Sequence, residues 1–529
     1  MTSASDAPWQ AIAAAAVVGT ERQPFQLPTP PGPLGNLLSQ LCGQPDEGVL
    51  LAAAAAIALH QHVGWQPETR AVPPANPCPT DDLPHCSPRA ARCFEQTLQG
   101  KYSQLLPDWL ALAAIAQQRA PEMLLPVLLD KGRQQRDLRA AILPVLGERG
   151  RWLAAQNPDW RYAIAPTTES EWETGTPAAR QIFLQELRSR DPNRARDLLQ
   201  TTWKQEAAGD RARFLQTFQT NLSLADEPFL EMALGDRRSQ EVRRVACDLL
   251  ARLPDSRLCQ QMGEAIRPYV TYSPGAAVPL TVQLPDALTP DLIQLGIEPK
   301  PPGQFPLQLG EKAGWLFQML GATPLAFWCE TWGLTAAEIV NLALAHEWQV
   351  LLCQGWALAA QRQSVGLPGE SPNCPWILAL LDSVIGYRLS GHEPVLAPHQ
   401  LATLLTSLPS APQHDFLLSL VRSHPGSIRQ PLILQLLGCS SGEWSGDLAQ
   451  TVLAQLGEYF AHPTDTSTRV WEMRTHLREF ARCLPVSLLP EALHLQSQLP
   501  ADSVWLTSVG DFLSLLYFRQ EMAQAFELP

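Results

Sequence analysis

The stretch DEPFLEMALGDRRSQEVRRVACDLLARLP, from Asp226 to Pro254, carries two apolar stripes at helical spacing, and it decides the expected fold. The first stripe precedes a turn at Gly235-Asp236, and the second follows that turn. The stripes consist of Phe229, Leu230, Ala233, Leu234, Val242, Val245, Ala246, Leu249, Leu250 and Leu253. Two such stripes joined by a tight turn predict a helical hairpin that buries its apolar faces on neighbouring elements.

The chain just upstream repeats this design in DPNRARDLLQTTWKQEAAGDRARFLQTFQTNL, from Asp191 to Leu222. Asp191 and Asp226 are the expected capping residues of the two hairpins, and they are 226 − 191 = 35 residues apart. This period is typical of stacked helix pairs, in which each pair buries its stripe on its neighbours. We therefore predict an all-α protein with HEAT-like helical repeats, that is, an α-solenoid.

Proline residues are expected to delimit the helices instead of breaking them. The chain has 48 prolines, and several directly follow a side chain that can cap a helix. Proline is tolerated at the first helical position because its missing N–H has no partner there. Three such pairs are Ser87-Pro88, Thr176-Pro177 and Asp191-Pro192, and Thr335 with Glu338 forms a capping-box pattern. Helix is therefore the expected structure over most of the chain.

Three stretches interrupt the helical pattern. Residues 66–88 form a proline-rich loop, residues 165–175 are typical of a linker, and residues 269–309 predict an extended insertion with one short β-hairpin. The expected parts are an N-terminal helical domain at 1–165, HEAT-like repeats at 176–267, an extended linker or small hairpin at 268–310, and an acidic C-terminal helical domain at 311–529.

Composition and charge exclude several classes of protein. Hydrophobic residues make up 45% of the chain and charged residues 17%, which is typical of a folded globular protein. The net charge is −13, and residues 268–529 alone hold 11 basic and 22 acidic side chains. Because nucleic-acid binding needs a net basic surface, we expect no nucleic-acid partner.

Membrane insertion and secretion are also unexpected. The longest apolar run, Val49 to Leu59, has 11 residues, whereas a membrane-spanning helix needs about 20. The 11 cysteines are odd in number and include no CxxC pair, which is typical of reduced thiols. These features predict a cytoplasmic protein without a disulfide framework.

Four possible metal ligands lie in and after the proline-rich loop, namely Cys78, His85, Cys86 and Cys93. Thiolate and imidazole are the ligands that zinc prefers, but this spacing matches no known zinc finger or ribbon. Cys93 also falls on an expected helix, where a buried cysteine is ordinary, so packing is the alternative to a metal site. The chain has no GxxxxGK motif and no GxGxxG motif after an expected strand, and we expect no cofactor.

An Arg/Trp cluster occurs in LPVLGERGRWLAAQNPDW, from Leu143 to Trp160. Its members are Arg149, Arg151, Trp152 and Trp160. Arginine and tryptophan are enriched among the hot spots of protein interfaces, so these four residues are the candidate interaction site. The alternative interpretation is an internal joint between two helices.

Several segments together resemble an uncharacterised bacterial family that is known only as a domain of unknown function. In chain order they are GTERQPF, LGERGRWLAAQNPDW, RDPNRARDLLQTTW, the Asp226–Pro254 hairpin and LGEKAGWLFQML. The resemblance implies HEAT-like helical repeats and no established catalytic residues. Members of such families are often encoded beside a SWIM zinc-finger protein, a MoxR-type AAA+ ATPase and a von Willebrand factor A protein, which the resemblance therefore implies as partners.

The expected function is that of a non-enzymatic scaffold or adaptor for protein partners, because stacked helix pairs offer extended binding surfaces. The alternative is an enzyme whose site is built from helix ends, similar to HEAT-like lyases or glycosylases. One hydrolase-like motif, GCSSG at residues 438–442, matches GxSxG but lacks the strand and helix context that this motif needs. We therefore expect no catalytic residue there.

Overall fold

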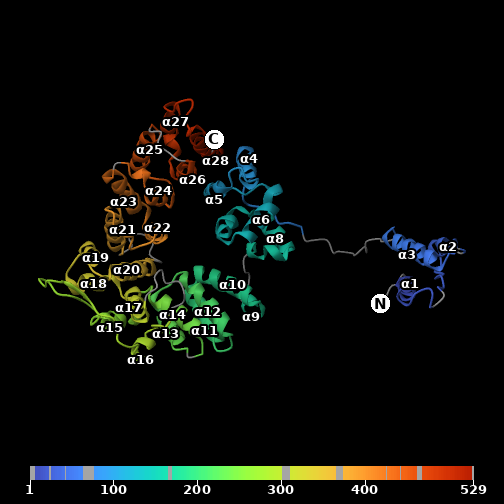
Figure 1. Cartoon of the computed structure of the whole chain (residues 1–529), viewed down its shortest axis with the longest axis horizontal. Coiled ribbons are helices and arrows are strands. Elements are labelled where there is room, and N and C mark those ends of the chain that lie inside the picture. The colour runs from blue at the N-terminus through green and yellow to red at the C-terminus, as the bar shows by residue number, and fades with distance from the viewer. Residues whose placement is uncertain are drawn as a thin grey trace. The chain divides into compact units, whose positions relative to one another are not determined.

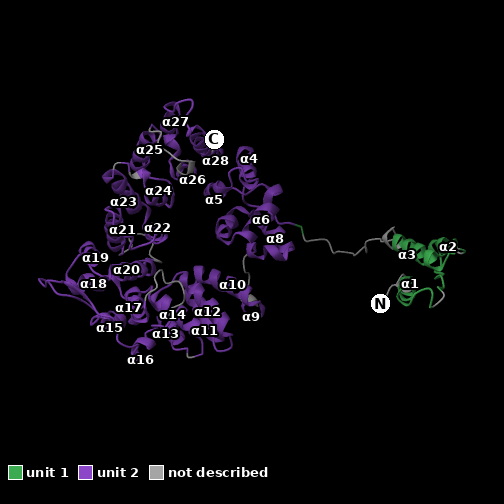
Figure 2. Cartoon of the chain, in the orientation of Figure 1, with its two compact units in different colours: residues 1–77 green, residues 78–529 purple. Residues whose placement is uncertain are grey.

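The contacts of the computed structural model divide the chain into two compact units, residues 1–77 and residues 78–529 (Figure 2). The structure describes residues 6–22, 25–41, 43, 45–63, 77–164, 170–236, 238–300, 310–364, 373–424, 426–440, 442–461 and 467–526. Residues 78–164 group with the later helices, which differs from the predicted N-terminal domain of residues 1–165. Parts of the predicted loop (66–76), linker (165–169) and insertion (301–309) lie outside the described residues.

The first unit consists of helices around a small apolar core. The helices are α1 (Asp6–Val18), α2 (Pro33–Ser39) and α3 (Asp46–Val63). Both α1 and α2 pack on α3. The buried core residues are Ile12, Leu34, Leu38, Ala53 and Ile57. None of the site residues expected from the sequence lies in this unit.

The second unit begins with short helices joined by 3-10 turns. The helices are α4 (Pro88–Leu98), α5 (Leu106–Ile115), α6 (Leu125–Gln134), α7 (Arg139–Ile142) and α8 (Gly147–Gln156). The 3-10 turns are Ser103–Leu105, Glu122–Leu124, Arg136–Leu138, Leu143–Val145 and Pro158–Ala163. The Ser87 side chain accepts a hydrogen bond from the Ala90 N–H, so the predicted cap of α4 is confirmed.

The region of the predicted repeats is helical as expected. Its helices are α9 (Ser170–Thr174), α10 (Pro177–Arg190), α11 (Pro192–Thr202), α12 (Ala208–Gln216), α13 (Glu227–Leu234), α14 (Gln240–Leu250) and α15 (Arg257–Ile266), with 3-10 turns at Thr217–Gln219 and Leu224–Asp226. α13 packs on α14 as the predicted hairpin. Thr176 and Asp191 cap α10 and α11, also as predicted.

The predicted β-hairpin is present in the insertion. Strands β1 (Val270–Tyr272) and β2 (Leu280–Val282) pair antiparallel, with Val270 opposite Val282. The short helix α16 (Pro290–Gln294) follows. The turn after α16, residues 295–299, packs on α14 and on the next long helix. This turn forms one wall of the candidate site described below.

The remainder of the second unit is a long series of helices. They are α17 (Glu311–Ala322), α18 (Leu325–Trp332), α19 (Ala336–Leu344), α20 (Gln349–Gln363), α21 (Cys374–Leu389), α22 (Pro398–Thr406), α23 (Ser410–Ser423), α24 (Pro431–Gly438), α25 (Gly446–Ala461), α26 (Ser467–Cys483), α27 (Leu489–Ser497) and α28 (Leu506–Phe526), with 3-10 turns at Ser427–Arg429 and Val486–Leu488. Thr335 and Glu338 form the predicted capping box of α19.

Helices of this series that do not follow one another directly in the chain form a continuous row. α17 packs on α20, α20 on α22, α22 on α24, α24 on α26, and α26 on α28. A second row contains α23, α25 and α27, each packed on the next (Figure 1). This two-row arrangement is that of an α-solenoid, in which each helix pair buries its apolar faces on its neighbours. The predicted all-α, helical-repeat architecture with a short β insertion is confirmed.

The last helix packs on the first helices of the same unit. α28 contacts both α4 and α5 (Figure 1). The Ser87 hydroxyl donates to the Ala525 carbonyl at 2.9 Å, and the Tyr102 and Phe518 rings stack at 4.1 Å. The end of the second unit is therefore packed against its beginning.

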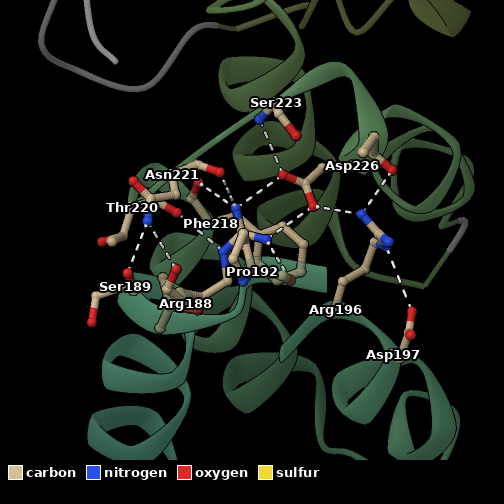
Figure 3. A network of polar contacts seen from close by, with 12 residues as sticks. Arg188, Ser189, Pro192, Arg196, Asp197, Phe218, Thr220, Asn221, Ser223 and Asp226 are labelled. Atoms are coloured by element: carbon tan, nitrogen blue, oxygen red, sulfur yellow. Dashed lines mark hydrogen bonds and ion pairs between the residues drawn. The ribbon is translucent and has the colours of Figure 1, made fainter. Parts of the chain in front are cut away.

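A buried ion pair holds the repeat region together (Figure 3). The Arg188 side chain, which is 0% exposed, donates to both carboxylate oxygens of Asp226 at 2.9 Å. The Arg196 side chain lies 3.3 Å from the same carboxylate. Asp226 was expected to cap α13, but its side chain makes no cap hydrogen bond to that helix. It instead accepts from the Ser223 N–H and neutralises Arg188.

The Arg188 guanidinium also ties chain segments together through backbone carbonyls. Its nitrogen atoms donate to the carbonyls of Pro192, Phe218, Thr220 and Asn221. The Asn221 side chain returns a hydrogen bond to the Arg188 carbonyl at 3.1 Å. Asn221 has φ +51, a left-handed conformation that asparagine tolerates better than most residues. One side chain thus joins α10, the start of α11 and the turn before α13.

Candidate ligand pocket

A hollow of about 630 Å³ opens between helices of the solenoid. Its walls come from α14, α15, α17, α20, α22 and the 295–299 turn. This volume lies within the range of small-molecule and peptide-side-chain sites. The apolar lining residues are Met262, Ile297, Phe317, Ala322, Ala357 and Leu358. We call this hollow the main pocket.

Two glycines allow the close packing of α17 on α20 beside the main pocket. A Cβ atom at Gly355 would lie 2.5 Å from the Leu320 Cβ atom, and one at Gly321 would lie 2.5 Å from the Leu358 side chain. Both distances are far below a normal contact, so a larger residue would push the helices apart. The glycines therefore fix the spacing of the two helices that form the pocket floor.

An ion-pair network connects α14 to α20 at the pocket wall. The Arg362 Nε atom donates to Asp248 at 3.0 Å, and its Nη1 atom donates to the Gly321 carbonyl at 3.0 Å. Arg252 also pairs with Asp248 at 3.0 Å. Asp248 thus pairs with a neighbour four positions later and also with a residue 114 positions later.

The 295–299 turn is fastened to the helices on both of its sides. The Gln318 amide pairs with the Glu298 backbone, accepting from its N–H at 2.9 Å and donating to its carbonyl at 3.1 Å. Arg243 donates to the Ile293 carbonyl at 2.9 Å. Gly296 has φ +87, and a Cβ atom there would lie 2.6 Å from the Cys247 sulfur. Glu298 is thereby held at the edge of the main pocket.

Burial raises the pKa of Glu298 above its ordinary value of 4.5, although Arg244, a hydrogen bond from Gln240, and Arg243 act in the opposite direction. The folded state therefore binds this proton more tightly than the unfolded state does. The resulting stability is fully present below pH 4.5 and is lost as the pH rises through the pKa of the folded state.

We expect Glu298→Gln to raise the melting temperature at pH 7, because glutamine mimics the protonated acid without its ionisation. The gain should shrink as the pH falls toward 4.5, the ordinary pKa of the group. Thermal unfolding at a series of pH values measures this. Glu241→Gln, at an exposed residue of α14, is the control and should show little pH-dependent difference. A less stable Glu298→Gln protein at pH 7 would contradict the expectation.

A second hollow of about 440 Å³ adjoins the main pocket. The two share Arg244, Gly296, Ile297 and Glu298 in their walls. The second hollow is also lined by Arg238 and Arg243, so its walls hold three arginines. We call it the arginine hollow.

The four possible metal ligands have different local surroundings. Cys78 donates a hydrogen bond to the neighbouring Pro79 carbonyl, and the His85 side chain is 62% exposed. Cys93 is buried on α4, and burial raises the pKa of its thiol, as it does for Cys86, to about 11 in the latter case. Among the described residues, which include all four, no group of three or more His, Cys, Asp or Glu side chains is placed to hold a metal ion.

His85 takes part in a polar cluster that anchors the segment before α4. The Arg119 Nη2 atom lies 2.6 Å from His85 Nε2, which accepts this hydrogen bond. Arg119 also pairs with Glu122 at 2.9 Å and with Asp81 at 3.5 Å. Asp81 accepts from the Arg149 N–H in the first turn of α8. These contacts fasten the end of the proline-rich loop to α8.

Three of the four candidate interaction residues contact acidic side chains of this same chain, within residues 78–164. Arg149 lies 3.7 Å from Glu122, and Arg151 pairs with Glu148 at 2.6 Å. The Trp160 indole donates to Asp130 at 3.0 Å and packs against the core. Trp152 is half-buried on α8. None of the four lines the main pocket or the arginine hollow, and their role in binding a partner stays a prediction.

Sequence reasoning did not find the main pocket. Its walls come from segments near residues 245, 297, 320, 357 and 400, and no local motif connects them. Trp328 and Trp356 are fully buried in the core. The only local signal for the site was the density of arginines on α14, which resembles an ordinary solvated face.

The fold and this site define an all-α helical-repeat protein with a short β-hairpin insertion. The chain belongs to the Family of unknown function (DUF5691), which matches residues 11–526. Neither the curated proteins nor the solved structures contain a match to it. No helix among the described residues combines the length and apolar character that crossing a bilayer requires.

Proposed function

We propose that this protein is a helical-repeat adaptor that binds a protein partner through the main pocket. One observation carries the proposal: a hollow of about 630 Å³ is lined by five helices of the solenoid, α14, α15, α17, α20 and α22, and by the 295–299 turn. A partner side chain could fill the apolar floor while the surrounding helices contact its backbone. Such insertion of an anchor into a pocket typically supplies most of the binding energy of an interface.

The proposed partners follow from the family resemblance. They are a MoxR-type AAA+ ATPase, a von Willebrand factor A protein and a SWIM zinc-finger protein. An adaptor with one anchoring pocket and a separate surface at Arg149, Arg151, Trp152 and Trp160 could hold two such proteins together. The arginines of this second surface already have acidic neighbours, Glu122 and Glu148.

The proposal is tested by blocking the pocket without disturbing the core. Thr403 is an exposed residue of α22 that lines the main pocket, and Thr406 is an exposed residue of the same helix that does not. We expect Thr403→Trp to reduce crosslinked capture of the partner from the native cell at least tenfold. Thr406→Trp should capture it as the wild type does. Equal capture by all three proteins, or no specific partner for the wild type, would overturn the proposal.

A second candidate function is an enzyme, and Glu298 is the observation that favours it. This carboxyl group has a pKa that burial raises, and it lines the same pocket as His399. Raised carboxyl pKa values are typical of general acids in active sites. The test is turnover of a panel of ester, glycoside and abasic-DNA substrates. Turnover that Glu298→Gln abolishes and Glu241→Gln preserves would favour the enzyme, and no turnover would remove it.

A further inference from the structure

We propose that the main pocket and the arginine hollow together bind one extended acidic peptide segment of the partner, with an acidic side chain in the arginine hollow and a nearby apolar side chain in the main pocket. This inference rests on the proposed adaptor function and adds the chemistry of the partner. It concerns a different set of residues from the Arg/Trp cluster expected from the sequence.

The charge of the arginine hollow favours an acidic occupant. Arg238, Arg243 and Arg244 line it, against the acids Asp236 and Glu298. Asp236 is already neutralised by a close ion pair with Arg211. Among the described residues, the ion pair of Arg244 is a 3.9 Å contact with Glu241 on its own helix, and both side chains are about half exposed. Arg244 also acts on the Glu298 carboxyl, which is the one acid of the hollow that remains to balance its arginines. The hollow therefore retains positive charge that a carboxylate could meet, and arginine binds carboxylates in a two-pronged geometry.

The main pocket suits an apolar side chain. Phe317, Met262 and Ile297 are buried side chains of its wall, and Leu358 and Ala357 complete the floor. Burying an aliphatic or aromatic side chain of the partner there would remove apolar surface from water on both sides. The volume of the pocket accommodates one large side chain together with part of the backbone that carries it.

A buried amide in the pocket wall offers a contact for the peptide backbone. Gln354 is 6% exposed and donates through Nε2 to the Val395 carbonyl at 3.2 Å. Its Oε1 atom has no hydrogen-bond partner among the described residues. Buried acceptors without a partner are uncommon because they lose their hydration and receive nothing in return. A rotation of the Gln354 side chain toward the pocket would let a backbone N–H of the peptide satisfy this oxygen.

An extended chain fits the arrangement better than a compact ligand. The two hollows share Arg244, Ile297 and Glu298, so a single ligand can occupy both only if it passes over the 295–299 turn. An extended peptide advances about 3.3 Å per residue and places successive side chains on opposite sides. An acidic residue and an apolar residue two positions apart therefore point toward the same surface.

The experiment measures the anisotropy of fluorescein-labelled peptides added to the full chain. One peptide contains a glutamate and, two positions later, a leucine, and two matched peptides replace the glutamate with lysine or the leucine with serine. We expect the first to bind at least tenfold more tightly than either of the others. Arg244→Glu should weaken its binding at least tenfold, and so should Thr403→Trp.

Arg213→Glu is the matched control for Arg244→Glu. Among the described residues, Arg213 is an exposed helical residue whose ion pair, like that of Arg244, is with an acid three positions earlier, and it lines neither hollow. It should bind the peptide as the wild type does. Equal binding of all peptides, a preference for lysine, or equal loss in Arg213→Glu would overturn the inference. The inference would also be overturned if the partner whose capture depends on Thr403 bound through a basic or neutral segment. In that case the proposed adaptor function would still stand.

Discussion

Asp226→Ala is expected to lower the free energy of unfolding of the second unit by about 3–5 kcal/mol, because it leaves a buried arginine without its counter-charge. The Arg188 side chain is fully buried and bonds both oxygens of Asp226. Removing the carboxylate keeps the cost of burying the cation and removes its compensation. The Ser223 N–H and Arg196 lose the same acceptor. Urea unfolding followed by circular dichroism measures the loss.

Asp197→Ala is the control for this prediction. Asp197 is an exposed acid that lies 3.7 Å from Arg196. Its substitution therefore removes a carboxylate from the same neighbourhood without leaving a buried charge unpaired. Its loss should cost less than about 1 kcal/mol. If Asp226→Ala cost no more than Asp197→Ala, the buried pair would not be a principal stabilising contact of the repeat region.

Trp109→Ala is expected to cost a similar amount, about 3–5 kcal/mol, because it opens a cavity where the last helix meets the first ones. Trp109 is fully buried, stacks on Phe94 at 4.1 Å and meets the edge of Phe526 at 5.3 Å. Its indole N–H donates to the Ala90 carbonyl at 2.9 Å. Hydrogen exchange should also show faster exchange in α28, because the substitution removes part of its docking surface.

Trp471→Ala provides the matched control, since Trp471 is 69% exposed on α26. Its removal should change stability by less than about 0.5 kcal/mol. Unchanged exchange in α28 of the Trp109→Ala protein would show that the contact between α28 and α4 or α5 does not depend on this ring.

Local sequence signals predicted local structure well. The apolar stripes of the Asp226–Pro254 segment became α13 and α14, and the capping pairs at Pro88, Pro177 and Pro192 begin α4, α10 and α11. These signals act within one or two helical turns, where a side chain can reach the backbone that it caps. They are therefore visible without knowledge of the tertiary fold.

Contacts between distant segments were not predictable in the same way. An apolar stripe shows which face of a helix is buried, but it does not indicate which other element covers that face. Nothing in the residues of α4 and α5 indicates that α28 covers them. The Arg362–Asp248 pair was equally unpredictable, because an arginine can form an ion pair with any acid that the fold brings close to it. The main pocket depends on several such pairings at once, so it appears only in the folded chain.

The packing of the final helix onto the first ones has a bearing on synthesis at the ribosome. α4 and α5 are translated well before α28, which contacts both of them. Until then the nascent chain carries an apolar surface around Trp109 without its cover, and such surfaces attract chaperones or other unfinished chains. A chain that stops before Leu506 would leave this surface open permanently. The synthesis of α28 is thus itself a step in the folding of the second unit.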